Sequence, residues 1–131
     1  MITVLQRSWQ ANLARLLHKA ESGILISSPY VTRQGVDFIT ENISPSLRSA
    51  GSLNVLTDLS PLNICQGATD PAALHSLVSS IPNTMMWHLP RLHAKVYIAD
   101  RECAIVTSGN LTAGGLSLNY EYGVEMRTST T

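Results

Sequence analysis

A histidine and a lysine stand two positions apart in the stretch LHAKVYIAD, and a loop rich in hydrogen-bond donors follows it. His93 and Lys95 lie in this stretch, and Ser108 and Asn110 lie in the later sequence TSGN. Lysine offers a point charge to a non-bridging phosphate oxygen, and serine and asparagine add hydrogen bonds. Histidine titrates near neutral pH, so it can attack phosphorus when neutral or protonate a leaving oxygen when charged. These residue types suit the cleavage of a phosphodiester.

We expect these side chains to meet at the open end of a β-hairpin. The apolar runs 92–99 and 103–107 are separated only by the sequence DRE, and such closely spaced strands typically form a hairpin. Side chains alternate along a strand, so His93 and Lys95 share one face at the end that meets the TSGN loop. Asp100 falls in the turn at the other end. A phosphate bound at the open end explains two cation-forming side chains in an otherwise apolar strand.

The rest of the chain predicts the elements that position this hairpin. Helical spacing marks residues 4–21, 36–43 and 71–81, and strand-like runs mark residues 24–31, 53–59, 84–90 and 122–127. This alternation indicates an α/β fold with a mixed, mostly parallel sheet, helices on both of its faces and a late antiparallel hairpin. The sequence has no internal repeat or linker, so we expect a single domain over residues 1–131, either compact or the front part of a longer protein.

Composition excludes several functional classes. Nine basic and nine acidic residues give a formal net charge of zero, so phosphate binding must come from a local cluster rather than from bulk charge. Cys65 and Cys103 are too few for a disulfide scaffold, and no HExxH motif, clustered Cys/His or paired aspartates predict a metal or other cofactor. No run approaches the ~20 apolar residues that span a bilayer. We therefore expect a cytoplasmic protein without a membrane partner.

The hairpin resembles a known family, the phospholipase D superfamily. The sequence HAKVYIAD fits that family's HxKxxxxD pattern, with His93, Lys95 and Asp100 on its fixed positions. TSGN stands where the family has a GSxN-type loop, which puts Ser108 and Asn110 on its serine and asparagine. The resemblance implies that His93, Lys95 and Asp100 belong to the catalytic set. It also implies that Lys95, Ser108 and Asn110 bind phosphate.

Two further features bear on this resemblance. Thr107 replaces the glycine that usually opens the loop. NYEYGVE resembles the family's N-x-E segment, so Glu121 joins the catalytic set as the expected acceptor of a hydrogen bond from His93. The resemblance covers residues 92–125, and the alternation that precedes them fits the family's fold. That fold usually closes with more chain after the last strand, so a truncation at this point would expose apolar surface.

The chain carries only one such motif, and this bears on the mechanism. Family members with one copy pair as homodimers, because the reaction needs two histidines. One histidine attacks phosphorus and forms a phosphohistidine, and the other protonates the leaving oxygen and then activates water. A two-fold axis through the site would supply both from His93. The turn position of Asp100 favours an orienting or structural role rather than proton transfer.

The resemblance favours a metal-independent endonuclease that acts on DNA. Single-motif members are often nucleases, some attached to helicase or DNA-recognition modules of restriction systems, so a separate module of that kind is an expected partner. Arg33, Arg91 and Arg127 are available to help grip DNA, and a supporting role of His88 stays open. The alternatives are a phospholipase D-type lipid phosphodiesterase, a non-catalytic dimerisation or nucleic-acid-binding module with a residual motif, and a generic α/β domain that matches by chance. The sequence does not separate DNA from RNA.

Overall fold

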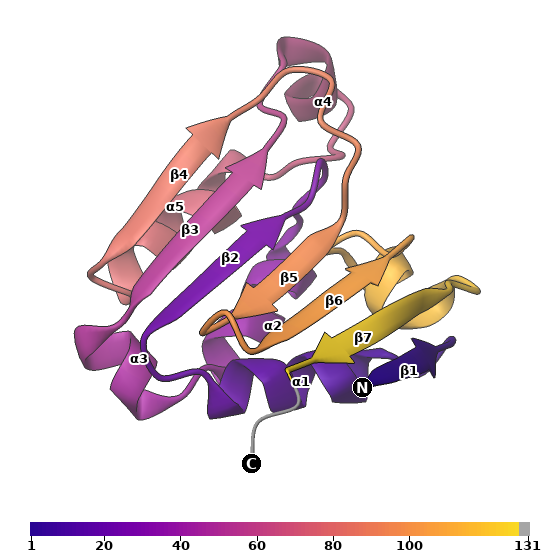
Figure 1. Ribbon diagram of the computed structural model, residues 1–131. Helices are drawn as coiled ribbons and strands as arrows, with labels where there is room; N and C mark the ends of the chain where they lie inside the picture. Colours follow the sequence, from indigo (N-terminus) through magenta and orange to yellow (C-terminus); the bar gives the residue numbers. More distant parts are fainter. Residues whose placement is uncertain (129–131) are drawn as a thin grey trace.

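The computed structural model describes residues 1–128 (Figure 1). Its strands are β1 (Ile2–Leu5), β2 (Gly23–Ser27), β3 (Ser52–Thr57), β4 (Thr84–His88), β5 (Val96–Ala99), β6 (Cys103–Thr107) and β7 (Gly123–Arg127). Its helices are α1 (Gln10–Lys19), α2 (Arg33–Asn42), α3 (Pro45–Ala50), α4 (Pro61–Cys65) and α5 (Pro71–Ser80), with a π-helical turn η1 (Gly114–Leu118). The strands form a seven-stranded sheet in the order β1-β7-β6-β5-β2-β3-β4.

The sheet is mixed, which confirms the predicted α/β class. β2, β3 and β4 pair in parallel. The other four pairings, β1–β7, β7–β6, β6–β5 and β5–β2, are antiparallel. Only two of the six pairings are therefore parallel, and the expectation that parallel pairing predominates is too strong. One reason is that only residues 100–102 separate β5 from β6, and so short a connection joins antiparallel neighbours. β7 and β1 then add further antiparallel pairs beyond β6.

The helices lie on one face of the sheet, which corrects the expectation of helices on both faces (Figure 1). Side chains on the helical face are fully buried: Ile26, Tyr97 and Ile105 are each 0% exposed. Leu25 and Val106, which point to the opposite face, are 36% and 41% exposed. Among residues 1–128, no helix covers that second face.

The order of the strands explains this one-sided arrangement. The chain passes from β1 through α1 to β2, then to β3 and β4, and each step moves in the same direction across the sheet. Crossovers between strands of the same direction are nearly always right-handed. Right-handed crossovers that all advance in one direction place all their helices on the same face. Helices cover both faces only where the direction reverses, and the predicted alternation of elements carries no information on that order.

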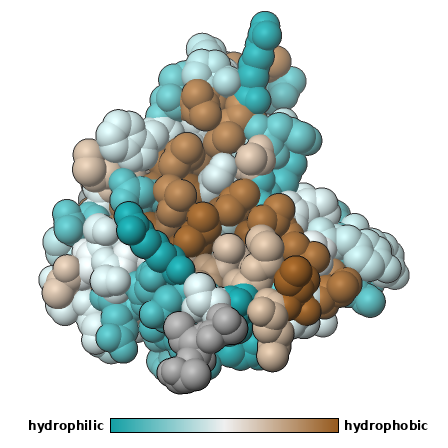
Figure 2. Space-filling view, in the orientation of Figure 1, coloured by the Kyte–Doolittle hydropathy of each residue, from teal (hydrophilic) through white to brown (hydrophobic). Residues whose placement is uncertain are grey.

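The uncovered face is strongly apolar (Figure 2). The large apolar side chains that it exposes come from five strands: Ile2, Val4, Leu25, Met85, Trp87, Val106 and Met126. Figure 2 shows a nearly continuous hydrophobic area across the middle of this face. An exposed apolar patch of this extent is unusual for the surface of a globular protein.

The core on the other face fixes the loop that follows β6. Leu13, Leu16 and Leu17 of α1 are buried and recur at helical spacing. Trp9, just before α1, packs against the ring of Tyr97 with centroids 5.5 Å apart. Its indole N–H donates to the carbonyl of Gly115 at 2.9 Å, which ties α1 to the chain between β6 and β7.

Candidate active site

Five of the predicted site residues gather at one edge of the sheet. His93 and Lys95 precede β5, Ser108 and Asn110 follow β6, and Glu121 precedes β7. Because β5, β6 and β7 are successively antiparallel, the start of β5, the end of β6 and the start of β7 lie at the same edge. The hairpin spacing of the sequence predicts this placement for His93, Lys95, Ser108 and Asn110. The predicted strand over residues 92–99 is too long at its start, because β5 begins only at Val96, so His93 and Lys95 lie in the segment before the strand.

Lys95 lies against the ring of His93. Its Nζ donates to the carbonyl oxygen of His93 at 3.0 Å and lies 3.3 Å and 3.4 Å from the two ring nitrogens. The backbone around them is fixed, since the Ser27 hydroxyl donates to the Ala94 carbonyl at 2.8 Å and the Thr107 N–H donates to the Lys95 carbonyl at 3.2 Å. The His93 side chain itself is exposed. One phosphate can therefore contact the imidazole and the ammonium group together.

Glu121 binds Ser108 rather than His93. The Ser108 hydroxyl donates to Glu121 Oε1 at 2.6 Å, and the Asn119 amide donates to Glu121 Oε2 at 3.3 Å. The Tyr122 N–H donates to the same Ser108 oxygen at 3.1 Å. The expected hydrogen bond from His93 to Glu121 is therefore wrong in this structure. The cause is the pairing at the ends of β6 and β7, which places Ser108 next to the residues around Tyr122.

Thr107 uses its side chain where the family has glycine. Its hydroxyl donates to the Tyr122 carbonyl at 3.2 Å and accepts from the Gly109 N–H at 3.2 Å. The Gly109 carbonyl in turn accepts from the buried Tyr97 hydroxyl at 3.1 Å. Burial is the largest cause that raises the pKa of Tyr97, so this hydroxyl stays a donor. The Thr107 side chain thus stabilises the loop that follows β6 through two hydrogen bonds that a glycine could not make.

The start of α2 lies beside Asn110, and the sequence did not single it out. A Cβ on Gly35 would lie 2.0 Å from the Leu111 carbonyl oxygen, so the helix packs directly on the loop. Asn110 Oδ1 and Thr32 Oγ1 are buried there without a hydrogen-bond partner among residues 1–128. The available signal was Thr32, a residue type that favours the position before a helix. The carbonyl oxygen of the Asn110 side chain is thus buried against the start of α2 without a donor among residues 1–128.

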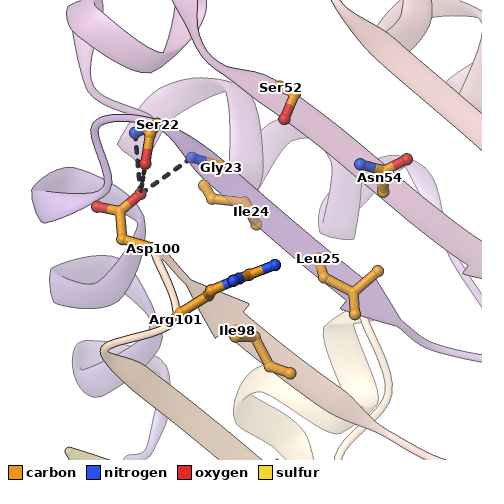
Figure 3. Close-up of a pocket in the computed structure, with 9 residues that line it drawn as sticks. All are labelled: Ser22, Gly23, Ile24, Leu25, Ser52, Asn54, Ile98, Asp100 and Arg101. Carbon is orange, nitrogen blue, oxygen red and sulfur yellow. Dashed lines mark hydrogen bonds between the residues drawn. The ribbon is translucent and has the colours of Figure 1, made fainter. Parts of the chain in front are cut away.

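Asp100 lies at the opposite end of β5 and makes a structural contact (Figure 3). Its carboxylate accepts from the backbone N–H groups of Glu21, Ser22 and Gly23, each at 2.9 Å, and from the Ser22 hydroxyl at 2.9 Å. Asp100 and Arg101 have φ of 54° and 60° at the centre of a turn in which the Glu102 N–H donates to the Ala99 carbonyl at 2.9 Å. Two successive positive φ values are typical of a type I′ turn. The hollow that Figure 3 draws lies at this end, on the uncovered face, away from His93.

Replacing Asp100 by alanine is expected to destabilise the fold by about 2 kcal/mol, because backbone donors of the α1–β2 connection lose their acceptor. Burial alone would raise the pKa of Asp100, but the hydrogen bonds from Glu21, Gly23 and Ser22 outweigh burial and lower it. The contribution is therefore present above the ordinary pKa of about 4 and is lost as the pH falls below it. Urea unfolding at pH 7 and pH 3 measures both effects.

The control for this prediction is Asp37→Ala, at an exposed position of α2. An unchanged unfolding free energy of Asp100→Ala at pH 7 would contradict this role.

Two further observations on the described residues concern metal binding and membrane-spanning helices. In residues 1–128, no three histidine, cysteine, aspartate or glutamate side chains are grouped so that they could hold a metal ion. Within the same part of the chain, every helix is too short or too polar to cross a bilayer.

With this geometry described, comparison with known proteins identifies the family. The family model described as "Cardiolipin synthase, PLD-like domain" matches residues 13–131. The chain therefore belongs to the phospholipase D superfamily, as its sequence motifs predict. No curated protein matches the chain.

Solved structures share its fold. Nuc from Salmonella typhimurium, a phospholipase D family member, is 16% identical with a TM-score of 0.75, and the match covers 98% of this chain and 83% of Nuc. NucT from Helicobacter pylori is 16% identical with a TM-score of 0.66, over 95% of this chain and 85% of NucT. The phosphatidylserine synthase of Haemophilus influenzae is 17% identical with a TM-score of 0.70, over 98% of this chain and 33% of the synthase. At these identities the likeness establishes the fold, and the superfamily supports phosphodiester chemistry at the site.

Proposed function

We propose that the protein hydrolyses phosphodiester bonds of DNA. The observation that carries this proposal is the convergence of His93, Lys95, Ser108 and Asn110 at one edge of the sheet, with the ammonium of Lys95 against the imidazole of His93. A nucleophile and cationic and amide donors within reach of one phosphate are the groups that such a reaction needs.

The proposed reaction uses two histidines in turn. A nitrogen of His93 attacks phosphorus and forms an N–P bond, while the bond to the leaving oxygen breaks. A second histidine gives its proton to that oxygen. Water then attacks the phosphohistidine and loses a proton to the second histidine, which releases a phosphate monoester and restores the site. In this proposal the second histidine is His93 of another copy, related by a two-fold axis through the site.

The remaining residues have supporting roles in the proposal. Lys95 and Asn110 bind the non-bridging oxygens and stabilise the charge that develops in the transition state. Ser108 assists them, and Glu121 acts as a positioning residue, because its carboxylate holds the Ser108 hydroxyl. Asp100 supports the hairpin from its far end and does not touch the substrate. No step of this mechanism calls on a metal ion.

A lipid substrate is the second candidate, and one observation favours it. The uncovered apolar face, which exposes Leu25, Met85 and Trp87 among others, could contact the acyl region of a membrane. DNA remains the first candidate because the motif occurs once and resembles that of single-motif nucleases, and because the site lies open at an edge where a long chain can pass.

Cleavage of DNA is expected to persist in the presence of excess EDTA, because histidine provides both the nucleophile and the acid–base. The purified protein is assayed with EDTA on single- and double-stranded DNA, on RNA and on phosphatidylcholine vesicles. Cleavage of DNA with accumulation of an acid-labile phosphohistidine is the expected result. Complete loss of activity with EDTA would exclude the proposed mechanism, and release of choline without cleavage of DNA would transfer the proposal to the lipid.

A further inference from the structure

The connection between β4 and β5 crosses the edge of the sheet that carries His93, and Arg91 has a strained backbone within it (Figure 1). Arg91 has φ of 65°, in the left-handed region that favours glycine. Its N–H donates to Asp58 Oδ2 at 3.1 Å. Asp58 is only 8% exposed, and its other oxygen accepts from the Ser60 N–H at 2.9 Å. A nearly buried carboxylate thus holds Arg91 in a conformation that an arginine rarely adopts, a feature that often marks functional sites.

The side chain of Arg91 does not stabilise the fold through polar contacts with the described residues. It is exposed, and its guanidinium makes no hydrogen bond or ion pair with any residue from 1 to 128. The carboxylate of Asp58 accepts hydrogen bonds from Ser60 and from the backbone N–H of Arg91. The constrained backbone of Arg91 therefore places a guanidinium group without a polar partner among residues 1–128 at this edge of the sheet.

His88 is anchored on the same edge. It is the last residue of β4, and its Nδ1 accepts from the Leu59 N–H at 2.9 Å. With Nδ1 acting as acceptor, the neutral ring carries its proton on Nε2. The side chain is exposed, so Nε2–H is available as a donor. His88 adds a second donor whose orientation the fold determines.

We propose that Arg91 and His88 form a second phosphate subsite, which binds the phosphate next to the scissile one in a polynucleotide. The inference rests on the proposed function and names its substrate class. Arg91 precedes His93 by two residues, so their Cα atoms are at most about 7 Å apart. The planar guanidinium suits bidentate contact with a phosphate. A polynucleotide presents a phosphate at every nucleotide, whereas a simple diester such as phosphatidylcholine has only one.

The test compares a long substrate with a short one. Arg91→Ala is expected to lower kcat/KM for a single-stranded DNA oligonucleotide about tenfold more than for bis(p-nitrophenyl) phosphate, mainly through KM. The dependence of oligonucleotide binding on salt should lose about one unit of its logarithmic slope, because one phosphate contact disappears. Arg91→Lys should recover part of the affinity, and His88→Ala should have a smaller effect in the same direction. Arg101→Ala is the matched control, since Arg101 has a similar φ of 60° at the opposite end of β5.

The outcomes separate this inference from the proposed function. Equal losses on both substrates, or an unchanged salt slope, would overturn the second subsite and leave the reaction at His93 in place. Failure of the wild-type protein to hydrolyse either substrate would overturn the proposed function. The binding measurement still decides the subsite in that case, because a phosphate contact of Arg91 changes the salt slope without any turnover.

Discussion

Replacing His93 by alanine is expected to lower kcat for DNA cleavage at least about a thousand-fold, because a covalent mechanism loses its nucleophile. In a homodimeric site the same substitution also removes the acid–base, so neither half of the reaction keeps its proton carrier. His93 is exposed, and among residues 1–128 its ring nitrogens have no polar partner except the ammonium of Lys95. The variant should therefore unfold at the wild-type urea concentration. Single-turnover cleavage of a labelled oligonucleotide measures the loss.

The control for this prediction is His18→Ala. His18 is exposed near the end of α1, and its replacement leaves the edge that carries His93 unchanged. A folded His93→Ala variant that cleaves DNA within tenfold of the wild-type rate would disprove the assignment of the nucleophile.

Mixing wild-type and His93→Ala subunits tests whether two copies share one site. If each dimer has one site that needs both histidines, mixed dimers are inactive, and an equal mixture after subunit exchange retains about a quarter of the wild-type activity instead of about half. Light scattering after size-exclusion chromatography checks that the protein is a dimer. A strict monomer, or activity proportional to the wild-type fraction, would remove the second histidine from the mechanism.

Local patterns in the sequence predicted the elements that short-range interactions determine. Asp70 and Pro71 predict the start of α5, and in the structure Asp70 accepts from the N–H groups of Ala72 and Ala73. The hairpin of β5 and β6 is likewise confirmed by its register. The long helix expected over residues 4–21 is wrong at its start, because residues 2–5 form β1 and pair with β7. That pairing joins the two ends of the chain, and no local pattern records it.

In the candidate site, too, the sequence predicts what local spacing determines and misses what contacts between distant segments determine. The meeting of His93 and Lys95 with the loop after β6 follows from the hairpin, so sequence spacing predicts it. The hydrogen-bond partner of Glu121 depends on how the segment before β7 lies against the end of β6. In the structure, the Ser108 hydroxyl donates to the Glu121 carboxylate. The strained backbone of Arg91 depends on the carboxylate of Asp58, which arrives from β3. Contacts between distant segments set both features, so a single sequence gives no local signal for them.

Replacing Lys95 by alanine is expected to lower kcat by on the order of a thousand-fold, with a smaller change in KM. The loss of one donor to developing transition-state charge costs about a hundred- to a thousand-fold. In a two-fold symmetric site both copies of Lys95 disappear together, which places the expected effect at the upper end of that range. The change falls mainly on kcat because the extra charge on the non-bridging oxygens exists only in the transition state.

Lys95→Arg separates charge from geometry. Arginine keeps the positive charge, but its planar fork cannot reproduce the contact of a compact ammonium that lies 3.0 Å from the His93 carbonyl and against the ring. We expect it to recover only part of the rate. Lys19→Ala is the matched control, because Lys19 is the other lysine of the chain and is exposed at the end of α1. If Lys95→Ala raised KM while kcat stayed at the wild-type value, Lys95 would bind the substrate uniformly and would not stabilise the transition state.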